Sequence, residues 1–299
     1  MIRVGNAPCS WGVLEFDVPP INAPAAQVLD EMAAAGYVGT ELGDWGFLPT
    51  DPRALANAVG RRGLALAGAF VPVALACADA LPDGTARAVR TARLLADAGF
   101  DQAFVVLSDA NATVPHRTAR AGRITASDGL SAHEWDGFAA RASAIASSVR
   151  DETGLRTVFH HHCGGYVETP REIDALMART DPALLGLCLD TGHLVFAGGD
   201  PRVEIGRYAA RIRHVHFKDC ARDVAARARS EEWDYHTAVR HGIFCELGRG
   251  MVRFADVRDA LRLQNFRGWI IVEQDVLPGL GAPAASAARN RDYLRRLGL

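Results

Sequence analysis

"LRTVFHHHCGGYVETPREIDALM", residues 155–177, contains in one stretch the repeating unit that decides the fold. The apolar residues at 155–160 predict a short β-strand that ends in polar side chains and is followed by two glycines. Thr169 before Pro170 is typical of a helix N-terminus, and a helix is predicted over 169–179. The stretch therefore predicts a strand, a loop and a helix in succession.

The same alternation continues from one end of the chain to the other. Strands are predicted at 2–6, 38–42, 64–70, 103–107, 155–160, 185–189, 212–217 and 269–273. Helices are predicted at about 23–35, 51–62, 84–98, 132–152, 169–179, 202–209, 253–263 and 283–297. Eight such units without a sharp change in composition predict an α/β protein with the (β/α)8 TIM barrel fold, as a single domain over residues 1–299. An open doubly wound sheet is disfavoured, because no GxGxxG turn follows the first strand.

Two predicted loops are unusually long, at 108–131 and at 218–251. Loops of this length in a compact domain are usually functional lids or contain secondary structure of their own.

Composition and charge favour a small ligand. The 33 Lys and Arg residues and 35 Asp and Glu residues leave a formal net charge of −2, so neither nucleic acid nor an anionic membrane is attracted by bulk charge. The longest apolar stretches, such as 64–78, are shorter than the roughly 20 residues of a membrane helix. No secretory signal is visible, and the six cysteines form no C-x-x-C pair. We therefore expect a cytoplasmic protein with reduced thiols.

Four consecutive predicted strands each end in residues that can bind a divalent metal. They are His160 and His162 on the fifth strand, Asp190 and His193 on the sixth, His214 and His216 on the seventh, and Glu273 on the eighth. Neighbouring strands of a barrel can bring such side chains to one point at the carboxyl end, where catalytic groups of TIM barrels lie. Strand alternation places His160 and His162 on one side and His161 on the other, which gives His161 a structural role. An unpaired Asp190 at a barrel mouth would be costly, so a cation or an arginine is expected beside it.

Other strand ends supply further candidates. Asn6 and Trp11 follow the first strand and are candidate substrate contacts, and Glu41 ends the second. Glu41 is either an ion-pair partner or a substrate contact or general base. Lys218, next to Asp219, either forms an ion pair or polarises a substrate oxygen. Cys163 beside His162 is a weaker candidate for a zinc ligand, because no second cysteine is near it in sequence.

Several of these segments resemble a known family. "CLDTGH", "HVHFKD" and "VEQD" resemble the xylose isomerase-like barrel superfamily of sugar isomerases, epimerases and dehydratases, which also includes endonuclease IV. The segments most similar to inosose (2-keto-myo-inositol) dehydratases are "GNAPCSWGVLEF", "GTELGDWGFLP", the H-x-H with "GGYVETP", and "HGIFCELGRGMVRF". The likeness spans nearly the whole chain. It implies one divalent metal held by His160, Asp190, His216 and Glu273, with His162 and His193 in contact with substrate.

The chain departs from the family pattern at two places. His160 stands where isomerases and epimerases carry a glutamate, and His161 replaces the proline of the dehydratase H-P-H motif. Proton transfer between two faces of a sugar works naturally with two carboxylates, so the loss of one favours elimination of water. Arg249 and Arg253 stand where the dehydratases tend to carry acids, so Arg249 is a candidate contact for a carboxylate, a phosphate or ring oxygens.

These residues lead to a mechanistic hypothesis. We expect a hydro-lyase that eliminates water from a cyclic keto-polyol such as 2-keto-myo-inositol, through an enediolate, as in inositol catabolism. Glu273, Glu41 or His193 would take the proton, and His162 or Lys218 would protonate the leaving oxygen. Mixed nitrogen and oxygen ligands favour Mn²⁺ or Co²⁺, with Zn²⁺ or Fe²⁺ as alternatives, and no organic cofactor is expected. The main alternative is a keto-sugar isomerase or epimerase. A non-catalytic sugar-binding barrel and an abasic-site endonuclease are less favoured, and a homo-oligomer is expected.

Overall fold

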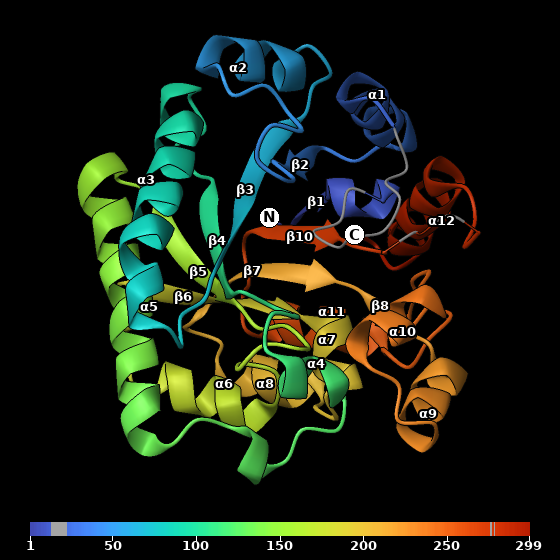
Figure 1. Ribbon diagram of the computed structural model, residues 1–299. Helices are drawn as coiled ribbons and strands as arrows, with labels where there is room; N and C mark the ends of the chain where they lie inside the picture. Colours follow the sequence, from blue (N-terminus) through green and yellow to red (C-terminus); the bar gives the residue numbers. More distant parts are fainter. Residues whose placement is uncertain (13–22, 276, 278) are drawn as a thin grey trace.

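Eight parallel strands close into a barrel in the computed structural model, which describes residues 1–12, 23–275, 277 and 279–299 (Figure 1). Around the barrel the order is β1-β10-β7-β6-β5-β4-β3-β2. The strands are β1 (Arg3–Asn6), β2 (Gly39–Glu41), β3 (Ala65–Val73), β4 (Phe104–Asp109), β5 (Arg156–His160), β6 (Leu185–Asp190), β7 (Ile212–Phe217) and β10 (Trp269–Val272). All eight predicted strands are present, so the predicted (β/α)8 barrel is confirmed. Residues 13–16 of the N-terminal family motif lie outside the described residues.

The outer layer contains the eight predicted helices, with ends shifted by a few residues. They are α1 (Ala25–Ala35), α2 (Pro52–Gly60), α3 (Leu81–Asp97), α5 (Ala132–Thr153), α6 (Pro170–Met177), α8 (Pro201–Arg207), α11 (Phe254–Leu263) and α12 (Pro283–Arg296). Side-chain caps begin several of them. Thr169 accepts a hydrogen bond from the Glu172 backbone N–H, and the Glu172 carboxylate in return accepts one from the Thr169 backbone N–H. Such reciprocal caps satisfy backbone groups that the first helical turn leaves unpaired.

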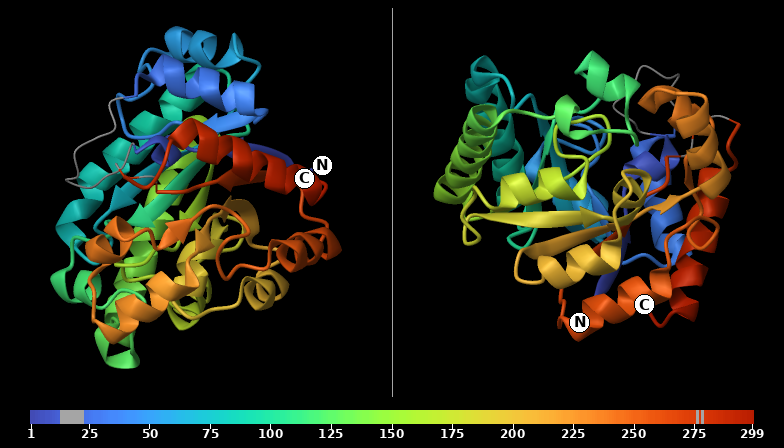
Figure 2. Two further views of the ribbon diagram at one scale, coloured as in Figure 1. Left: turned by 90° about the vertical axis from the view of Figure 1, so that its right-hand side faces the viewer. Right: turned by 90° about the horizontal axis from the view of Figure 1, so that it is seen from below.

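Both long loops contain secondary structure. Residues 108–131 include α4 (Pro115–Ala119) and the 3-10 turn η3 (Ala126–Asp128), and residues 218–251 include β8 (Asp219–Cys220), α9 (Arg222–Ser230), α10 (Tyr235–Arg240) and β9 (Phe244–Cys245). The short strands β8 and β9 pair in antiparallel fashion. These segments gather at the end of the barrel toward which β7 and β10 point (Figure 1), the end that faces the viewer in the left panel of Figure 2. Their own apolar cluster, around Phe196, Tyr235 and Ile243, holds them together.

Three short elements complete the described chain: α7 (Thr191–Phe196) directly after β6, and the 3-10 turns η1 (Pro8–Trp11) and η2 (Ala78–Ala80). Among the described residues, none of the helices combines the length and the hydropathy that a membrane-spanning segment requires.

The inside of the barrel is filled rather than open. Phe104, Val106, Val158 and Cys188 form a buried apolar cluster within it, with Phe70 packed against them. The His214 ring lies on this cluster, with its centroid 5.6 Å from that of Phe104. Polar side chains above the cluster are therefore held at the carboxyl end of the strands, as is usual for TIM barrels.

Candidate active site

A cavity of about 490 Å³ opens at the carboxyl end of the strands. Its volume falls within the roughly 300–1,000 Å³ typical of small-molecule sites. Many of the strand-end residues singled out from the sequence line it: Glu41, His160, His162, His216, Lys218 and Glu273.

The D-T-G-H motif after β6 is built into the first turn of α7. Asp190 Oδ1 accepts a hydrogen bond from the His193 backbone N–H at 2.8 Å and so caps the helix. The Thr191 hydroxyl donates to Lys218 O at 2.7 Å and accepts from Lys218 N, which ties this turn to β7. A Cβ on Gly192 would lie 2.7 Å from Lys218 Cγ, so only glycine fits there. This local structure leaves Asp190 Oδ2 directed at the neighbouring strands.

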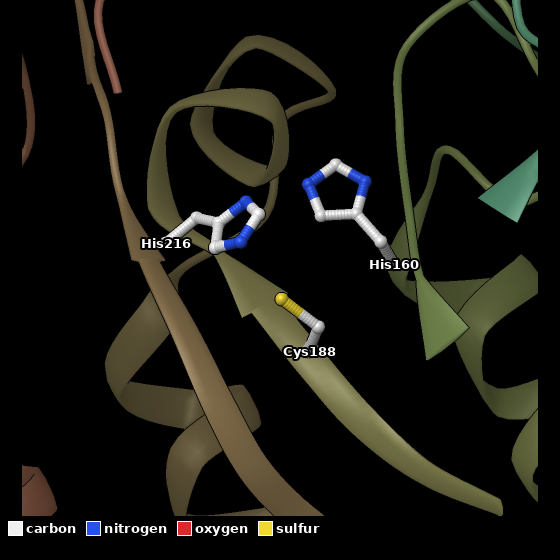
Figure 3. Close-up of side chains that lie close together, drawn as sticks. All are labelled: His160, Cys188 and His216. Atoms are coloured by element: carbon white, nitrogen blue, oxygen red, sulfur yellow. The ribbon is translucent and has the colours of Figure 1, made fainter. Parts of the chain in front are cut away.

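The proposed metal ligands converge. Donor atoms of His160, Asp190, His216 and Glu273 all lie within 4.8 Å of one another, and all four residues are buried. Asp190 Oδ2 is 3.6 Å from His160 Nε2 and 3.9 Å from His216 Nδ1, which is 3.2 Å from Glu273 Oε1. Figure 3 shows His160 and His216 pointing toward one another from β5 and β7.

Several of these atoms lack partners. Asp190 Oδ2 and both ring nitrogens of His160 are buried with no hydrogen bond to any described residue. Burying an unpaired carboxylate oxygen beside unpaired imidazole nitrogens is costly, and a cation between them removes that cost. The donor set, two imidazoles and two carboxylates, therefore fits a divalent metal ion.

Cys188, on β6, belongs to the same neighbourhood although sequence reasoning gave it no role. Figure 3 shows its thiol near the rings of His160 and His216, and the three donor atoms lie within 4.8 Å of one another. Burial raises the pKa of this thiol to about 12. The carboxylate-containing set already supplies two negative charges, so it is the stronger candidate for a divalent ion.

Glu41 lies beneath the candidate metal ligands and contacts two imidazoles. Its Oε1 accepts hydrogen bonds from His214 Nε2 at 2.6 Å and from His216 Nε2 at 3.0 Å. Burial by itself raises the pKa of Glu41, but the imidazoles of His216 and His214 lower it to about 2. The hydrogen bond from His216 Nε2 to this carboxylate directs Nδ1 at Asp190 and Glu273, the orientation found in carboxylate–histidine–metal arrangements.

His162 lies at the wall of the cavity with its ring against that of His193, the two rings tilted by 39° and their centroids 3.8 Å apart. Nδ1 of His162 donates to Cys163 O at 2.7 Å, because a carbonyl oxygen can only accept. Nε2 is then unprotonated, and it lies 3.4 Å from the Tyr235 hydroxyl. Burial, with the neighbouring His160, lowers the pKa of His162 well below its usual value. His193 is fully buried behind His162 and does not line the cavity.

His161 faces away from this group. Its Nε2 accepts a hydrogen bond from the Asp190 backbone N–H at 3.1 Å. Burial lowers its pKa to about 3, so the ring stays neutral and can accept this bond. The position agrees with the structural role expected from strand alternation.

Lys218 is surrounded by acids. Its Nζ lies 3.1 Å from Glu273 Oε2, 3.3 Å from Asp275 Oδ1 and 3.3 Å from His193 Nε2. Burial lowers the pKa of this amine, but Asp275 and Glu273 outweigh burial and hold the pKa well above its usual value. Lys218 is therefore charged, and it pairs with these acids rather than with its neighbour Asp219.

Asp219 instead organises the turn around residues 248–252. Its carboxylate accepts hydrogen bonds from the backbone N–H groups of Gly248, Gly250, Val252 and Cys220, at 2.8–3.0 Å. A Cβ on Gly250 would lie 2.3 Å from Asp219 Oδ1. The glycines of "LGRGMV" are therefore explained by this turn.

The turn directs its arginines away from the cavity, so the structure does not bring them to the site. Arg249 has a side chain that is 72% exposed and forms an ion pair with Glu246 at 3.1 Å. Arg253 is exposed and pairs with Asp256.

Two further predicted contacts are buried and do not line the cavity. Asn6 is fully buried, and its Oδ1 accepts from the Ala7 backbone N–H. Trp11 is also buried, and its Nε1 donates to Glu31 at 2.6 Å. Asn6 Oδ1 and Trp11 Nε1 are therefore engaged by other residues of the chain.

Tyr235 and Asp275 line the cavity and were missed from the sequence. Tyr235 lies on α10, inside a long loop that lacked any periodic signal. Asp275 lies two residues after Glu273 in the segment "VEQD", and that spacing was the one available signal.

The xylose isomerase-like TIM barrel family matches residues 29–297 of the chain. The chain belongs to this family. An inosose dehydratase from Geobacillus kaustophilus (strain HTA426) is 34% identical over 297 residues, which cover 99% of this chain and 94% of that protein. An inosose dehydratase from Lacticaseibacillus casei is 31% identical over 308 residues, which cover 98% of this chain and 96% of that protein. The predicted family is confirmed, and so is the prediction that the chain is an enzyme similar to these hydro-lyases.

Solved structures show the same fold at lower identity. An L-ribulose 3-epimerase has a TM-score of 0.73 at 18% identity, covering 99% of this chain and 94% of that chain. The probable 3-DHS dehydratase AsbF from Bacillus anthracis has a TM-score of 0.71 at 12% identity, covering 99% of each chain. At these identities the likeness shows the fold alone.

Proposed function

We propose that the protein is a metal-dependent dehydratase that eliminates water from a cyclic keto-polyol such as 2-keto-myo-inositol. The observation that carries the proposal is the convergence of His160, Asp190, His216 and Glu273 in a cavity that also contains Lys218 and His162. The full-length relatives named inosose dehydratase support the substrate class.

His160, Asp190, His216 and Glu273 would hold the ion, and their mixed nitrogen and oxygen donors favour Mn²⁺ or Co²⁺ over Mg²⁺ or Ca²⁺. The chemistry that a divalent ion supplies at such a site is Lewis-acid stabilisation of the negative charge that develops on a ketone oxygen as an enediolate forms.

We assign proton abstraction to His162, in place of the proton-donor role that was expected for it from the sequence. Its Nε2 carries the lone pair at the cavity wall, because Nδ1–H is bound to Cys163 O. The His193 ring packs against it, with the centroids 3.8 Å apart, and restricts this orientation. The other candidate bases are less available. Glu41 accepts hydrogen bonds from two imidazoles, and Glu273 is in contact with His216 and Lys218. His193 does not line the cavity. A base must lie within reach of the proton it takes, and His162 meets this condition best.

We assign protonation of the departing hydroxyl group to Lys218. It is a charged donor, and its 3.3 Å contacts to Asp275 and His193 are long enough to be exchanged for a substrate oxygen. Donation from the ammonium assists departure of the hydroxyl as water. His162 then takes the proton from one carbon atom, and Lys218 protonates the hydroxyl that leaves the adjacent carbon atom.

The alternative activity is isomerisation or epimerisation of a keto-sugar on the same barrel. A proton moved between two faces needs two groups able to exchange it on opposite sides of the substrate. His160 at the end of β5 supplies a metal ligand in place of a second carboxylate, which favours elimination.

The experiment starts from protein stripped with a chelator and reloaded with Mn²⁺ or Co²⁺. With 2-keto-myo-inositol in D₂O, we expect diketone absorbance to appear only in the reloaded protein. The Lys218→Met variant, which is similar in length but uncharged, should lose most of this rate. Deuterium in recovered keto-sugar without diketone would identify an epimerase, and metal binding without either product would identify a binding protein.

A further inference from the structure

A second cavity, of about 360 Å³, lies at the opposite end of the barrel, where the strands begin. Four arginines line it, from the starts of β1, β5 and β7 and from the residues before β10: Arg3, Arg156, Arg213 and Arg267. Among the described residues no acidic side chain lines this cavity. In a chain with a net charge of −2, this is a local concentration of positive charge.

Three of the four arginines of this cavity have no polar partner among the described residues. In the described parts of the chain, the side chains of Arg3, Arg156 and Arg267 form no ion pair and no hydrogen bond. Many surface arginines elsewhere in the described chain pair, as Arg179 does with Asp136 at 2.9 Å, and single exposed arginines such as Arg53 do not, so the distinguishing feature of the cavity is that three unpaired guanidinium groups lie together. The unpaired guanidinium groups therefore have their donors available.

Aromatic rings orient two of these groups. The Arg3 guanidinium carbon lies 4.0 Å from the ring centroid of Trp269, and that of Arg156 lies 4.6 Å from the ring centroid of Phe104. Stacking restricts the guanidinium plane and leaves its N–H edges free. A planar fork with free N–H edges is suited to binding two oxygens of a carboxylate or phosphate.

Positive charges are also held close together in this cavity. Burial lowers the pKa of Arg213, and the charge of Arg156 lowers it further, while Asp181 opposes the shift. Arg213 donates to Pro182 O at 2.6 Å, so it cannot swing freely away. An anion placed among these groups would relieve the repulsion.

We propose that this cavity binds the phosphate group of a small phosphorylated metabolite. The arginines would hold the phosphate oxygens. The cavity is far larger than one phosphate, and the side chains of Gln102, Gln264 and Phe266 are placed to contact the rest of the molecule. The site lies at the end of the barrel away from the candidate metal ligands, so the proposal does not rest on the proposed dehydratase activity.

Binding to the full-length protein tests the proposal at low ionic strength. Inorganic phosphate and glucose 6-phosphate are titrated by calorimetry into wild-type protein and two double variants. Arg3→Gln/Arg156→Gln removes two unpaired arginines of the cavity. Arg53→Gln/Arg222→Gln removes the same charge from exposed positions on α2 and α9 that have no ion pair among the described residues. Unfolding temperatures confirm that all three proteins are folded.

We expect wild type and the control to bind glucose 6-phosphate with a Kd below about 1 mM, and the cavity variant to bind about tenfold or more weakly. If inorganic phosphate binds as tightly as glucose 6-phosphate, the occupant is free phosphate. If inorganic phosphate binds more weakly than glucose 6-phosphate, the occupant is an organic phosphate. Equal weakening in both variants, or no binding to wild type, would overturn the proposal. A change from oligomer to monomer in the cavity variant, with no phosphate binding in wild type, would show instead that this face joins copies of the chain.

Discussion

Replacement of Glu41 by glutamine distinguishes a positioning role from a role as general base. Oε1 of Glu41 accepts from His214 Nε2 at 2.6 Å and from His216 Nε2 at 3.0 Å. Glutamine keeps the shape of the side chain but removes its charge. Its NH₂ group, if directed at His216, would also favour the tautomer that places hydrogen on Nδ1, the nitrogen directed at Asp190 and Glu273.

The expected loss can be estimated from these two bonds. A hydrogen bond to a charged group contributes roughly 1.5–3 kcal/mol, and a neutral one about 1 kcal/mol. Weakening the bond to His216 alone therefore costs about 0.5–2 kcal/mol, which corresponds to a loss of metal affinity of roughly two- to thirtyfold. Loss of a carboxylate that supports a metal-bound histidine typically costs 10- to 100-fold, which overlaps the upper part of this range.

The measurement is the dissociation constant for Mn²⁺ or Co²⁺, by competition with a metal chelator, and metal content after dialysis. Asp44→Asn is the matched control, because Asp44 also lines the cavity but has no bond to either histidine. We expect Glu41→Gln to bind metal at least about tenfold more weakly and Asp44→Asn to match wild type. Unchanged metal affinity together with a large fall in kcat at saturating metal would refute the positioning role and restore Glu41 as a base.

Three other predictions concern the strand-5 histidines, a buried acid and a turn. His160→Ala should lose metal, His162→Ala should keep metal but lose rate, and His161→Ala should mainly lower the unfolding temperature; equal metal loss in all three would contradict these assignments. Glu168 is buried, and burial raises its pKa to about 7 although Gly164 and Gly122 donate to it. Its pKa is thus higher in the folded than in the unfolded protein, so the free energy of unfolding should fall by up to about 3 kcal/mol as pH rises from about 4.5 to 7. Chemical denaturation of Glu168→Gln should show less of this slope, and an identical slope would disprove it. Asp219→Ala leaves four backbone N–H groups without their acceptor and should lower stability by about 2–4 kcal/mol in the same assay.

Periodicity was sufficient to predict the barrel. Alternating strands and helices bury their apolar faces in only a few ways, and eight repeated units leave the closed barrel as the natural solution. The same two-residue period placed His160 toward the cavity and His161 away from it. Both inferences depend on residues close together in the chain, so they needed no knowledge of distant contacts.

Short polar helices gave no such signal. The helices α9 and α10 lie within 218–251 and pack on their own apolar cluster, so their stability depends on tertiary contacts rather than on a long apolar stripe. Tyr235 was missed for this reason. The turn around residues 248–252 was likewise invisible, because it depends on the Asp219 carboxylate bound to backbone N–H groups far along the chain.

The fold, the family and the set of polar residues at the strand ends could all be predicted from local sequence patterns. Which of those residues meet depends on contacts between strands that are distant in the sequence. Glu41 and His214 are 173 positions apart, yet barrel closure brings them within 2.6 Å. Arg249 lies in a segment that resembles the family, but the turn whose glycines bind Asp219 directs its side chain outward. The physical reason is that strand period specifies the side on which a residue lies, whereas distances across a barrel depend on how all eight strands close.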